Sequence, residues 1–205
     1  MKTIGYTFIL FTILSAIACE KPLIKTGSII GVVKDATTGE PIANADVFLM
    51  QNEIGDGDIW NGGGPSEQID YTTSDANGNF SFLFDYDKGY RYLCGAEKSL
   101  YFDLNQEFSV DEDTKNGNNV EVLLNPVAFL SIHYENVVPN SLFDNFAING
   151  YISDGFNGAD IDTTIVYQVQ GNIYNVLYWG LYMDITYTDS IYSPSFDTTY
   201  FEILY

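Results

Sequence analysis

Apolar and polar residues alternate with a period of two in short runs along most of this chain. The runs are rich in Val, Ile, Thr, Tyr and Phe, they are separated by Gly, Asn, Asp and Pro, and none keeps the period of an amphipathic helix. This pattern is typical of an all-β protein with frequent turns. In the first half it predicts strands at 29–34, 45–50, 71–74, 80–84, 90–96, 107–110 and 120–124.

The second half repeats the all-β pattern after Pro126, which we take as a domain boundary. The sequence therefore predicts two β-sandwich domains, residues 27–124 and a smaller one at 125–205. Alternation also predicts which side chains share a core face. In the first domain these are Val47 with Leu49, then Phe80, Phe82 and Phe84, then Val120, Val122 and Leu124. The second-half strands are predicted at 129–135, 146–153, 163–170, 175–188 and 198–204.

Residues 1–18 have the pattern of an export signal, with Lys2, an apolar run from Ile4 to Leu14 and small residues before the cut. The run is too short to span a bilayer. The next residues, Ala16-Ile17-Ala18-Cys19, resemble the lipobox of bacterial lipoproteins, although leucine usually stands where this chain has Ala16. The resemblance implies a lipid on Cys19, a tether at 19–26 and a protein anchored to a membrane without spanning it. An ordinary signal peptide is the alternative.

The chain is strongly acidic, with 8 Lys and Arg against 28 Asp and Glu and a formal net charge of −20. Such a charge repels nucleic acid and anionic lipid, so neither is an expected partner. If Cys19 carries lipid, Cys94 has no partner within the chain. We expect no disulfide, and we expect Cys94 to be a small buried side chain within an alternating run.

Two stretches of the first domain together carry a family resemblance. "GSIIGVVKDATTGEPIANADVFLMQ" followed by "YTTSDANGNFSF" is similar to the carboxypeptidase regulatory-like domain, a seven-stranded transthyretin-like Greek-key sandwich common in outer-membrane proteins of Bacteroidota. The similarity covers residues 27–124. It implies a structural or binding module without catalytic residues, located in the cell envelope. Which side of the outer membrane the protein would face stays open.

The loop "TTSDANGNFSF" also raises the question of a calcium site. Asp75, Asn77 and Asn79 occupy positions one, three and five of an EF-hand-like run, but Gly78 stands at position four and Tyr86 at position twelve. The ligand pattern is therefore incomplete, and Asn-Gly between two strand-like runs predicts a β-hairpin.

A second acidic stretch, "SDGFNGADIDTT", offers Asp154, Asn157, Asp160 and Asp162 in a glycine-containing loop. These oxygen ligands could hold a structural calcium ion, the one cofactor that we consider, but the same residue types are favoured in any exposed turn. Asp56 and Asp58 form a weaker candidate.

Enzymatic chemistry has little support. His133 is the only histidine, and alternation places it with Ser131 and Glu135 opposite an apolar row. The chain has no Gly-x-Ser-x-Gly turn, and no His or Cys cluster that could bind zinc. We therefore predict that the protein is not an enzyme, with a hydrolase that uses His133 as a distant alternative.

An aromatic row is the remaining candidate for binding. In "YNVLYWGLYMDITYT", alternation puts Tyr174, Tyr178 and Tyr182 opposite a core row of Leu177, Trp179, Leu181, Met183 and Ile185. With Trp60 in the long loop, these tyrosines could stack on sugar rings or on an envelope protein. Tyrosine is also simply a good strand residue. The sequence thus favours a lipid-anchored structural or binding accessory, with carbohydrate binding as the first alternative.

Overall fold

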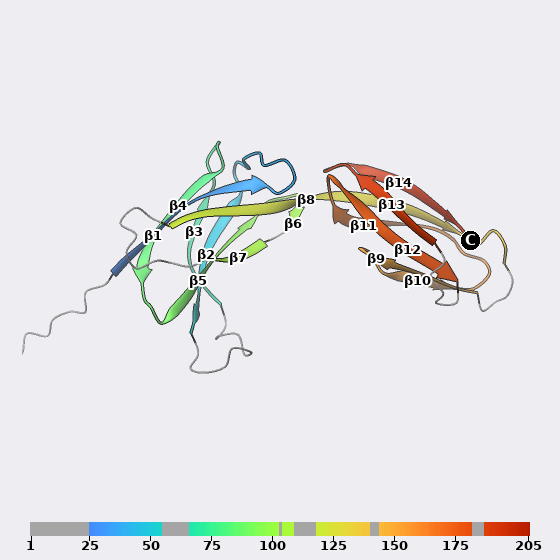
Figure 1. Cartoon of the computed structure of the whole chain (residues 1–205), viewed down its shortest axis with the longest axis horizontal. Helices are drawn as coiled ribbons and strands as arrows, with labels where there is room; N and C mark the ends of the chain where they lie inside the picture. Colours follow the sequence, from blue (N-terminus) through green and yellow to red (C-terminus); the bar gives the residue numbers. More distant parts are fainter. Residues whose placement is uncertain (1–24, 55–65, 103, 109–117, 140–143, 182–186) are drawn as a thin grey trace, which may run out of the picture.

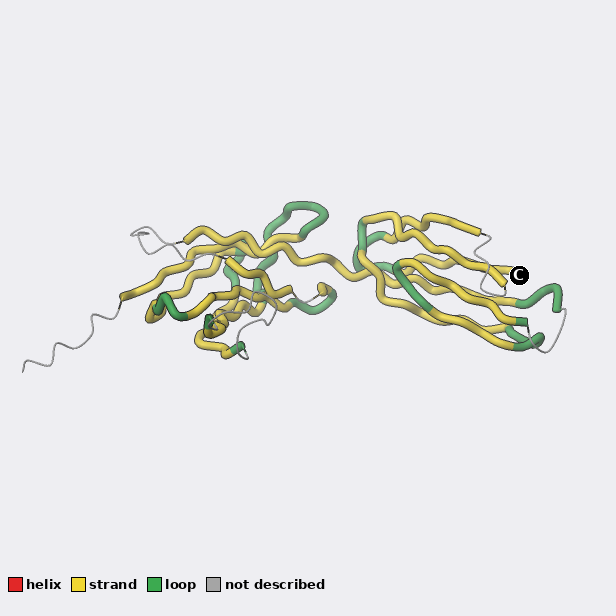
Figure 2. The backbone as a smooth tube through the Cα atoms, turned by 60° about the horizontal axis from the view of Figure 1, so that its bottom comes forward, coloured by secondary structure: helices red, strands yellow, loops and turns green. Residues whose placement is uncertain are grey.

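The computed structural model describes residues 25–54, 66–102, 104–108, 118–139, 144–181 and 187–205, and these residues form strands and turns without a helix (Figures 1 and 2). None of the described residues belongs to a helix long and apolar enough to cross a membrane. The all-β prediction is confirmed. The strands are β1 Lys25–Asp35, β2 Asp46–Glu53, β3 Glu67–Thr73, β4 Asn79–Tyr86, β5 Tyr90–Glu97, β6 Tyr101–Phe102, β7 Leu104–Phe108, β8 Asn118–Glu135, β9 Asn145–Gly150, β10 Asp154–Asn157, β11 Asp162–Gln170, β12 Ile173–Leu181, β13 Tyr187–Ser193 and β14 Thr198–Leu204.

The first sandwich packs a sheet of β4, β1 and the first part of β8 against a sheet ordered β3-β2-β5-β7. The strand β1 is antiparallel to β4 and parallel to β8. The side chains between the two sheets form one apolar cluster from Ile29 to Leu124. The three rows predicted from alternation are all buried in it: Val47 and Leu49, then Phe80, Phe82 and Phe84, then Val120, Val122 and Leu124.

The second sandwich packs the remainder of β8, with β11 and β14 on its two sides, against a sheet ordered β10-β9-β12-β13. A separate apolar cluster, from Ala128 to Ile203, fills its interior. The strand β8 contributes Ala128, Leu130, Ile132 and Tyr134 to this cluster, all fully buried, as the alternation around His133 predicts.

One continuous strand, β8, belongs to both sandwiches, whereas the sequence predicted separate strands at 120–124 and 129–135. Pro126 lies in its middle, where β8 exchanges β1 for β11 and pairs only with the two-residue strand β6. Proline has no backbone N–H to donate to a neighbouring strand. It is tolerated here because β8 changes partners at this point, so that a missing donor interrupts neither ladder. The sandwiches lie end to end along β8, with the start of β1 and the C-terminus at opposite ends of an elongated molecule (Figure 1).

Side chains from both sandwiches interlock at this junction. Asn172 of the second sandwich donates from Nδ2 to Thr37 Oγ1 of the first at 3.0 Å, and the Thr37 hydroxyl donates to Asp35 at 2.7 Å. The Tyr101 hydroxyl donates to the other Asp35 oxygen at 3.2 Å, and the Tyr101 ring packs edge-on against Phe196 with centroids 5.3 Å apart. The backbone N–H of Ser195, beside Phe196, returns to Asn172 Oδ1 at 3.0 Å. These contacts form a closed ring of residues.

Charge stabilises this ring. Burial alone would raise the pKa of Asp35, but donation from Thr37, Thr38 and Tyr101 outweighs it and holds the pKa of Asp35 below its ordinary value. Burial, with the carboxylate of Asp35 nearby, raises the pKa of Tyr101 to about 12. Asp35 is therefore an anion held by neutral donors, an arrangement whose hydrogen bonds are stronger than those between neutral groups.

The hairpin predicted at Asn77-Gly78 is wrong. The loop is a tight turn, in which the Asp75 carboxylate accepts from the N–H groups of Asn77 and Asn79 at 2.8 Å each, and Gly78 takes a positive φ of 75°. However, β3 pairs with β2 and β4 pairs with β1, so the turn carries the chain from one sheet to the other. Local turn chemistry fixed the bend without fixing which strands pair.

Other strands also differ from prediction. The predicted strand 175–188 is an antiparallel pair, β12 and β13. The predicted strand 146–153 ends at Gly150, whose φ of 122° turns the chain and where a Cβ would lie 2.5 Å from the carbonyl oxygen of Val176. Two short strands were not predicted, β6 and β10, and β10 takes up part of the acidic stretch considered as a calcium loop.

Candidate functional site

Several residues singled out from the sequence lie outside the described residues: Cys19, Trp60, Tyr182, and the weaker pair Asp56 and Asp58. The lipid attachment and the contribution of the long loop to binding therefore stay predictions.

Three of the four residues considered for calcium have separate partners. Asp154 accepts a hydrogen bond from the Tyr167 hydroxyl at 2.9 Å, and Asn157 accepts one from Asn145 at 2.6 Å. Asp162 contacts His133, and Asp160 follows β10 without entering a strand. Among the described residues, no group of three or more His, Cys, Asp or Glu side chains could hold a metal ion. The structure thus gives the calcium prediction no added support.

The partners of Asp154 belong to a chain of hydrogen bonds through the second sandwich. The buried Tyr134 hydroxyl donates to Tyr167 at 3.1 Å, and Tyr167 donates to Asp154. Tyr134 and Tyr167 stand on β8 and β11, while Asp154 stands on β10 in the opposite sheet. Burial raises the pKa of Tyr134, and it also raises the pKa of Tyr167 to about 12. Both hydroxyls therefore stay protonated, so the chain is a structural link between the two sheets.

His133 lies on the outer face of the sheet formed by β11, β8 and β14, with both ring nitrogens engaged. Nε2 is 2.9 Å from Asp162 Oδ1 on β11, and Nδ1 is 3.2 Å from Glu202 Oε1 on β14. Hydrogen bonds to Asp162 and then to Glu202 raise the pKa of His133. A ring with a carboxylate on each nitrogen favours the imidazolium form, in which both nitrogens are donors.

This geometry does not suit a catalytic base, because a base must present an unprotonated nitrogen to its nucleophile. A groove of about 470 Å³ beside His133 is lined by Ser131, Thr164 and Tyr200 among others. Ser131 is two residues from His133 on the same strand, roughly 6.6 Å along it, which is beyond direct hydrogen bonding. The arrangement holds three strands together, and the hydrolase alternative gains no support from it.

Cys94 is fully buried and unpaired in the core of the first sandwich, and burial raises the pKa of its thiol to about 12. The expectation of a small buried side chain is confirmed, and the reactive thiolate form is disfavoured in this environment.

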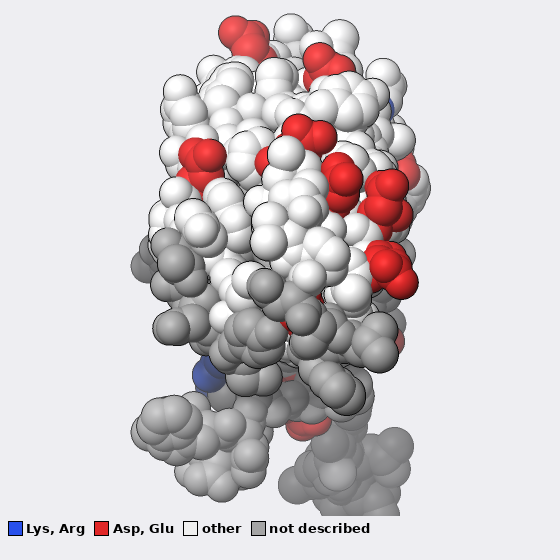
Figure 3. Space-filling view, turned by 90° about the vertical axis from the view of Figure 1, so that its right-hand side faces the viewer, with Lys and Arg blue, Asp and Glu red and all other residues white. Residues whose placement is uncertain are grey.

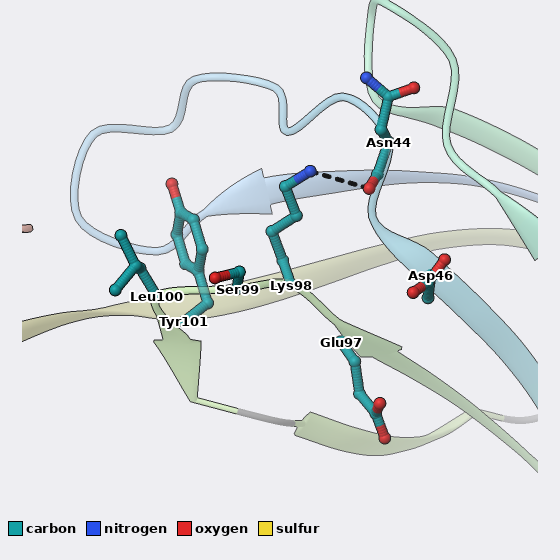
Figure 4. A pocket seen from close by; sticks show the side chains of 7 residues that line it. All are labelled: Asn44, Asp46, Glu97, Lys98, Ser99, Leu100 and Tyr101. Carbon is teal, nitrogen blue, oxygen red and sulfur yellow. Dashed lines mark hydrogen bonds between the residues drawn. The ribbon is translucent and has the colours of Figure 1, made fainter.

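A groove of about 490 Å³ lies on the first sandwich near the junction (Figure 4). Lys98 reaches across it and donates from Nζ to the carbonyl oxygen of Asn44 at 2.9 Å. Asp46 and Glu97 are register partners on β2 and β5, and Asp46 also accepts from the Tyr71 hydroxyl at 2.6 Å. Two charged groups that line the groove, the Lys98 ammonium and the Asp46 carboxylate, are thus already hydrogen-bonded within the fold.

The predicted tyrosine row does point outward. On β12, Tyr174, Val176 and Tyr178 are exposed while Leu177 is buried and Trp179 and Leu181 pack against the core. The sequence interpretation missed Tyr192 on β13, which is the register partner of Tyr174 and contacts it with ring centroids 5.3 Å apart. Alternation within 187–193 could have revealed it, had that segment been separated from β12.

Charge is unevenly divided along the chain. Residues 125–205 contain no Lys or Arg against nine Asp and Glu, so His133 supplies the only cationic side chain. In the view onto the end of the molecule that holds the second sandwich, Asp and Glu side chains are scattered among uncharged ones (Figure 3). An anionic polymer would be repelled from this end.

No family model matches the chain, and no curated protein matches it significantly. Similar solved structures include the Bacillus anthracis TIE protein, at 14% identity and a TM-score of 0.36, over 87% of this chain and 34% of that one. A variant of shaft pilin SpaA from Lactobacillus rhamnosus GG is 9% identical, with a TM-score of 0.38, over 87% of this chain and 97% of that one. A streptococcal ancillary pilin is 13% identical, with a TM-score of 0.36, over 90% of this chain and 63% of that one.

TM-scores this low do not establish a shared overall arrangement, so these neighbours carry no argument about function. The resemblance to the carboxypeptidase regulatory-like domain continues to rest on the motifs quoted from the sequence.

Proposed function

We propose that this protein is a lipid-anchored, non-catalytic accessory of the cell envelope, whose first sandwich holds the second at a fixed distance and orientation from the membrane. The observation that carries the proposal is the junction. A single strand runs through both sandwiches, and the ring of contacts through Asp35, Tyr101 and Asn172 closes around it. Sandwiches joined only by a flexible linker would be free to reorient.

The direction of the chain supports the same proposal. The predicted anchor, Cys19, lies a few residues before β1 in the sequence, and β1 begins at the end of the molecule opposite the C-terminus (Figure 1). With a lipid on Cys19, the second sandwich would be the part farthest from the membrane. The side chain best placed for hydrolysis, His133, has both nitrogens occupied by carboxylates, which fits a structural role for that site.

The anchor is tested by metabolic labelling with an alkynyl fatty acid, using the full chain and Cys19→Ala. We expect the label on the wild type alone, in the outer-membrane fraction. Equal labelling of the two proteins would overturn the anchor, because Cys94 is buried and is not an alternative acceptor.

Rigidity is tested by distances between spin labels on the two sandwiches. Leu83→Cys on β4 and Tyr200→Cys on β14 are exposed positions, while Cys94 is buried and resists labelling. The doubly labelled protein, secreted without its lipid in a Cys19→Ala background, should give one narrow distance distribution. Asn172→Ala with Phe196→Ala should broaden it, and a broad distribution in the parent would contradict the proposed spacer.

A further inference from the structure

The outer face of the β10-β9-β12-β13 sheet is the feature that the proposed spacer leaves unexplained. Its central part, here named the tyrosine face, consists of the outward positions of β12 and β13: Tyr174, Val176, Tyr178, Thr188, Ser190 and Tyr192. Tyr174 is 67% exposed, and the other two tyrosines are also exposed. On the neighbouring strands β9 and β10, the outward positions hold only Asn, Ala and Gly.

The described outward positions of this sheet carry no charge, in a chain with a net charge of −20. The outer faces of the other sheets differ. The opposite face of the same sandwich carries Asp162, His133 and Glu202, and the β4-β1-β8 face of the first sandwich carries the ion pair of Lys34 and Glu121. The tyrosine face is therefore uncharged, whereas these two faces carry ionisable side chains.

The polar groups of the tyrosine face are neutral hydroxyls and amides arranged beside the rings. Tyr178 lies between Thr188 on β13 and Asn149 on β9 as register partners. Tyr178 is the first aromatic contact point of this face, and the ring pair of Tyr174 and Tyr192, with centroids 5.3 Å apart, is the second. The two points are four residues apart along β12, which corresponds to about 13 Å. Val176 and Ser190 lie between them.

We propose that the tyrosine face binds a neutral polysaccharide, with sugar rings stacked on Tyr178 and on the Tyr174 and Tyr192 pair. The apolar face of a pyranose ring packs on an aromatic ring, while its hydroxyl groups exchange hydrogen bonds with Thr188, Ser190 and Asn149. A spacing of about 13 Å along a strand suits several consecutive sugar units better than one. The proposal rests on the proposed function, in which the second sandwich is the exposed end of an accessory protein.

Charge decides among the possible ligands. An acidic glycan or nucleic acid would meet a domain without Lys or Arg, and it would be repelled. A cationic partner would find its complement on the faces that carry carboxylates, and not on this one. Protein interfaces are also rich in tyrosine and poor in charge, but the other side chains enriched in them, Trp, Phe, Arg and Met, are absent from the described outward positions of this face, which hold small hydroxyls and amides beside the tyrosines. A neutral chain of hydroxyl-bearing rings fits the remaining chemistry.

The test is affinity electrophoresis of the unlipidated chain in gels containing xylan, β-glucan, galactomannan or arabinogalactan, with polygalacturonate as an acidic probe. We expect at least one neutral polysaccharide to retard the protein. Tyr174→Ala and Tyr178→Ala should each weaken that binding by about tenfold, in the range that one aromatic contact contributes. Both residues are exposed, so folding should be preserved, and circular dichroism and thermal unfolding check this.

Tyr200→Ala is the matched control, because Tyr200 is an exposed strand tyrosine of the same sandwich on its charged face. It should bind like the wild type. The proposal is overturned if no neutral polysaccharide retards the protein, if only polygalacturonate does, or if Tyr200→Ala loses binding as much as Tyr174→Ala. A photo-crosslinker at position 190 that captures an envelope protein, with no retardation by any glycan, would also overturn it in favour of a protein partner. The labelling and distance experiments do not depend on glycan binding, so either proposal can fail alone.

Discussion

The interiors of the two sandwiches are built differently. The first is almost wholly apolar, and its buried polar side chains, Asp35 and Ser74, serve loops at its ends: Ser74 donates to the carbonyl of Ile42 and accepts from the N–H of Ala45. The second is crossed by hydrogen bonds. Asn175 reaches the Gln170 carbonyl and the Ser193 hydroxyl, and the chain from Tyr134 through Tyr167 to Asp154 joins its sheets.

The difference shows two ways of specifying a sandwich. Apolar rows determine which face of a strand is buried, but they tolerate exchange among partners of similar size. Buried hydrogen bonds are directional, and leaving one partner unsatisfied is costly, so they also determine which side chains meet. Among the described residues, fewer apolar side chains are buried in the second sandwich than in the first, so the second sandwich depends more on hydrogen bonds.

The largest expected effect tests whether the two sandwiches unfold separately or as one unit. Leu124 and Leu177 are fully buried, one in each cluster, and each Leu→Ala change should cost about 2–5 kcal/mol of unfolding free energy. Because β8 is shared, we expect Leu124→Ala to destabilise the second sandwich as well. In a Trp60→Phe background, Trp179 fluorescence reports on the second sandwich during urea unfolding. A Trp179 transition unchanged by Leu124→Ala would show two independent units.

The junction is tested by Asp35→Asn, which keeps the shape and removes the charge. We expect a loss of about 1.5–3 kcal/mol near neutral pH, the range for hydrogen bonds to a charged group. Since the folded pKa of Asp35 lies below its ordinary value, its contribution is present above the unfolded pKa and is lost as the pH falls through the folded pKa. The difference between wild type and variant, measured by urea unfolding, should therefore shrink in acid. Glu40→Gln, on the same loop, is the control, and it should stay within about 0.5 kcal/mol of wild type.

The polar interior of the second sandwich is tested by two hydroxyl deletions. Tyr167→Phe leaves the Tyr134 hydroxyl without its acceptor and Asp154 Oδ2 without the Tyr167 donor, so it should cost about 1–2 kcal/mol. Tyr134→Phe removes only the first donor and should cost about 0.5–1 kcal/mol. The double variant should cost less than the sum, because the hydroxyls form one chain. Equal and additive effects in thermal or urea unfolding would mean that the chain does not act as a unit.

The contrast between apolar rows and directional contacts also explains which features of the fold could be predicted from the sequence. Alternation alone predicted the buried rows of the first sandwich and the outward direction of Tyr174 and Tyr178, because facing is a local property of a strand. It could not predict that β3 and β4 belong to different sheets or that β8 continues through Pro126, because pairing depends on distant partners.

Side chains that meet across the fold were equally out of reach. His133 meets Asp162 and Glu202 only because β11 and β14 flank β8, and Tyr192 joins Tyr174 only through the register of β12 with β13. The acidic stretch considered as a calcium site has oxygen ligands at a suitable density, but part of it forms β10, and Asp154 and Asp162 bind different side chains.

The smallest expected effect concerns His133. Its hydrogen bonds join three strands on the outer face of the second sandwich, as those of Tyr167 join the two sheets in the interior. Its pKa is raised in the fold, so its stabilising contribution is fully present below the unfolded pKa and is lost as the pH rises through the folded pKa. His133→Gln should therefore lower the urea midpoint most in mildly acidic buffer and least in mildly alkaline buffer. The effect should also weaken with salt, since the group is at the surface. In an Asp162→Asn and Glu202→Gln background, the pH dependence should disappear. A His133→Gln difference that grew with rising pH would instead identify a neutral ring as the stabilising form.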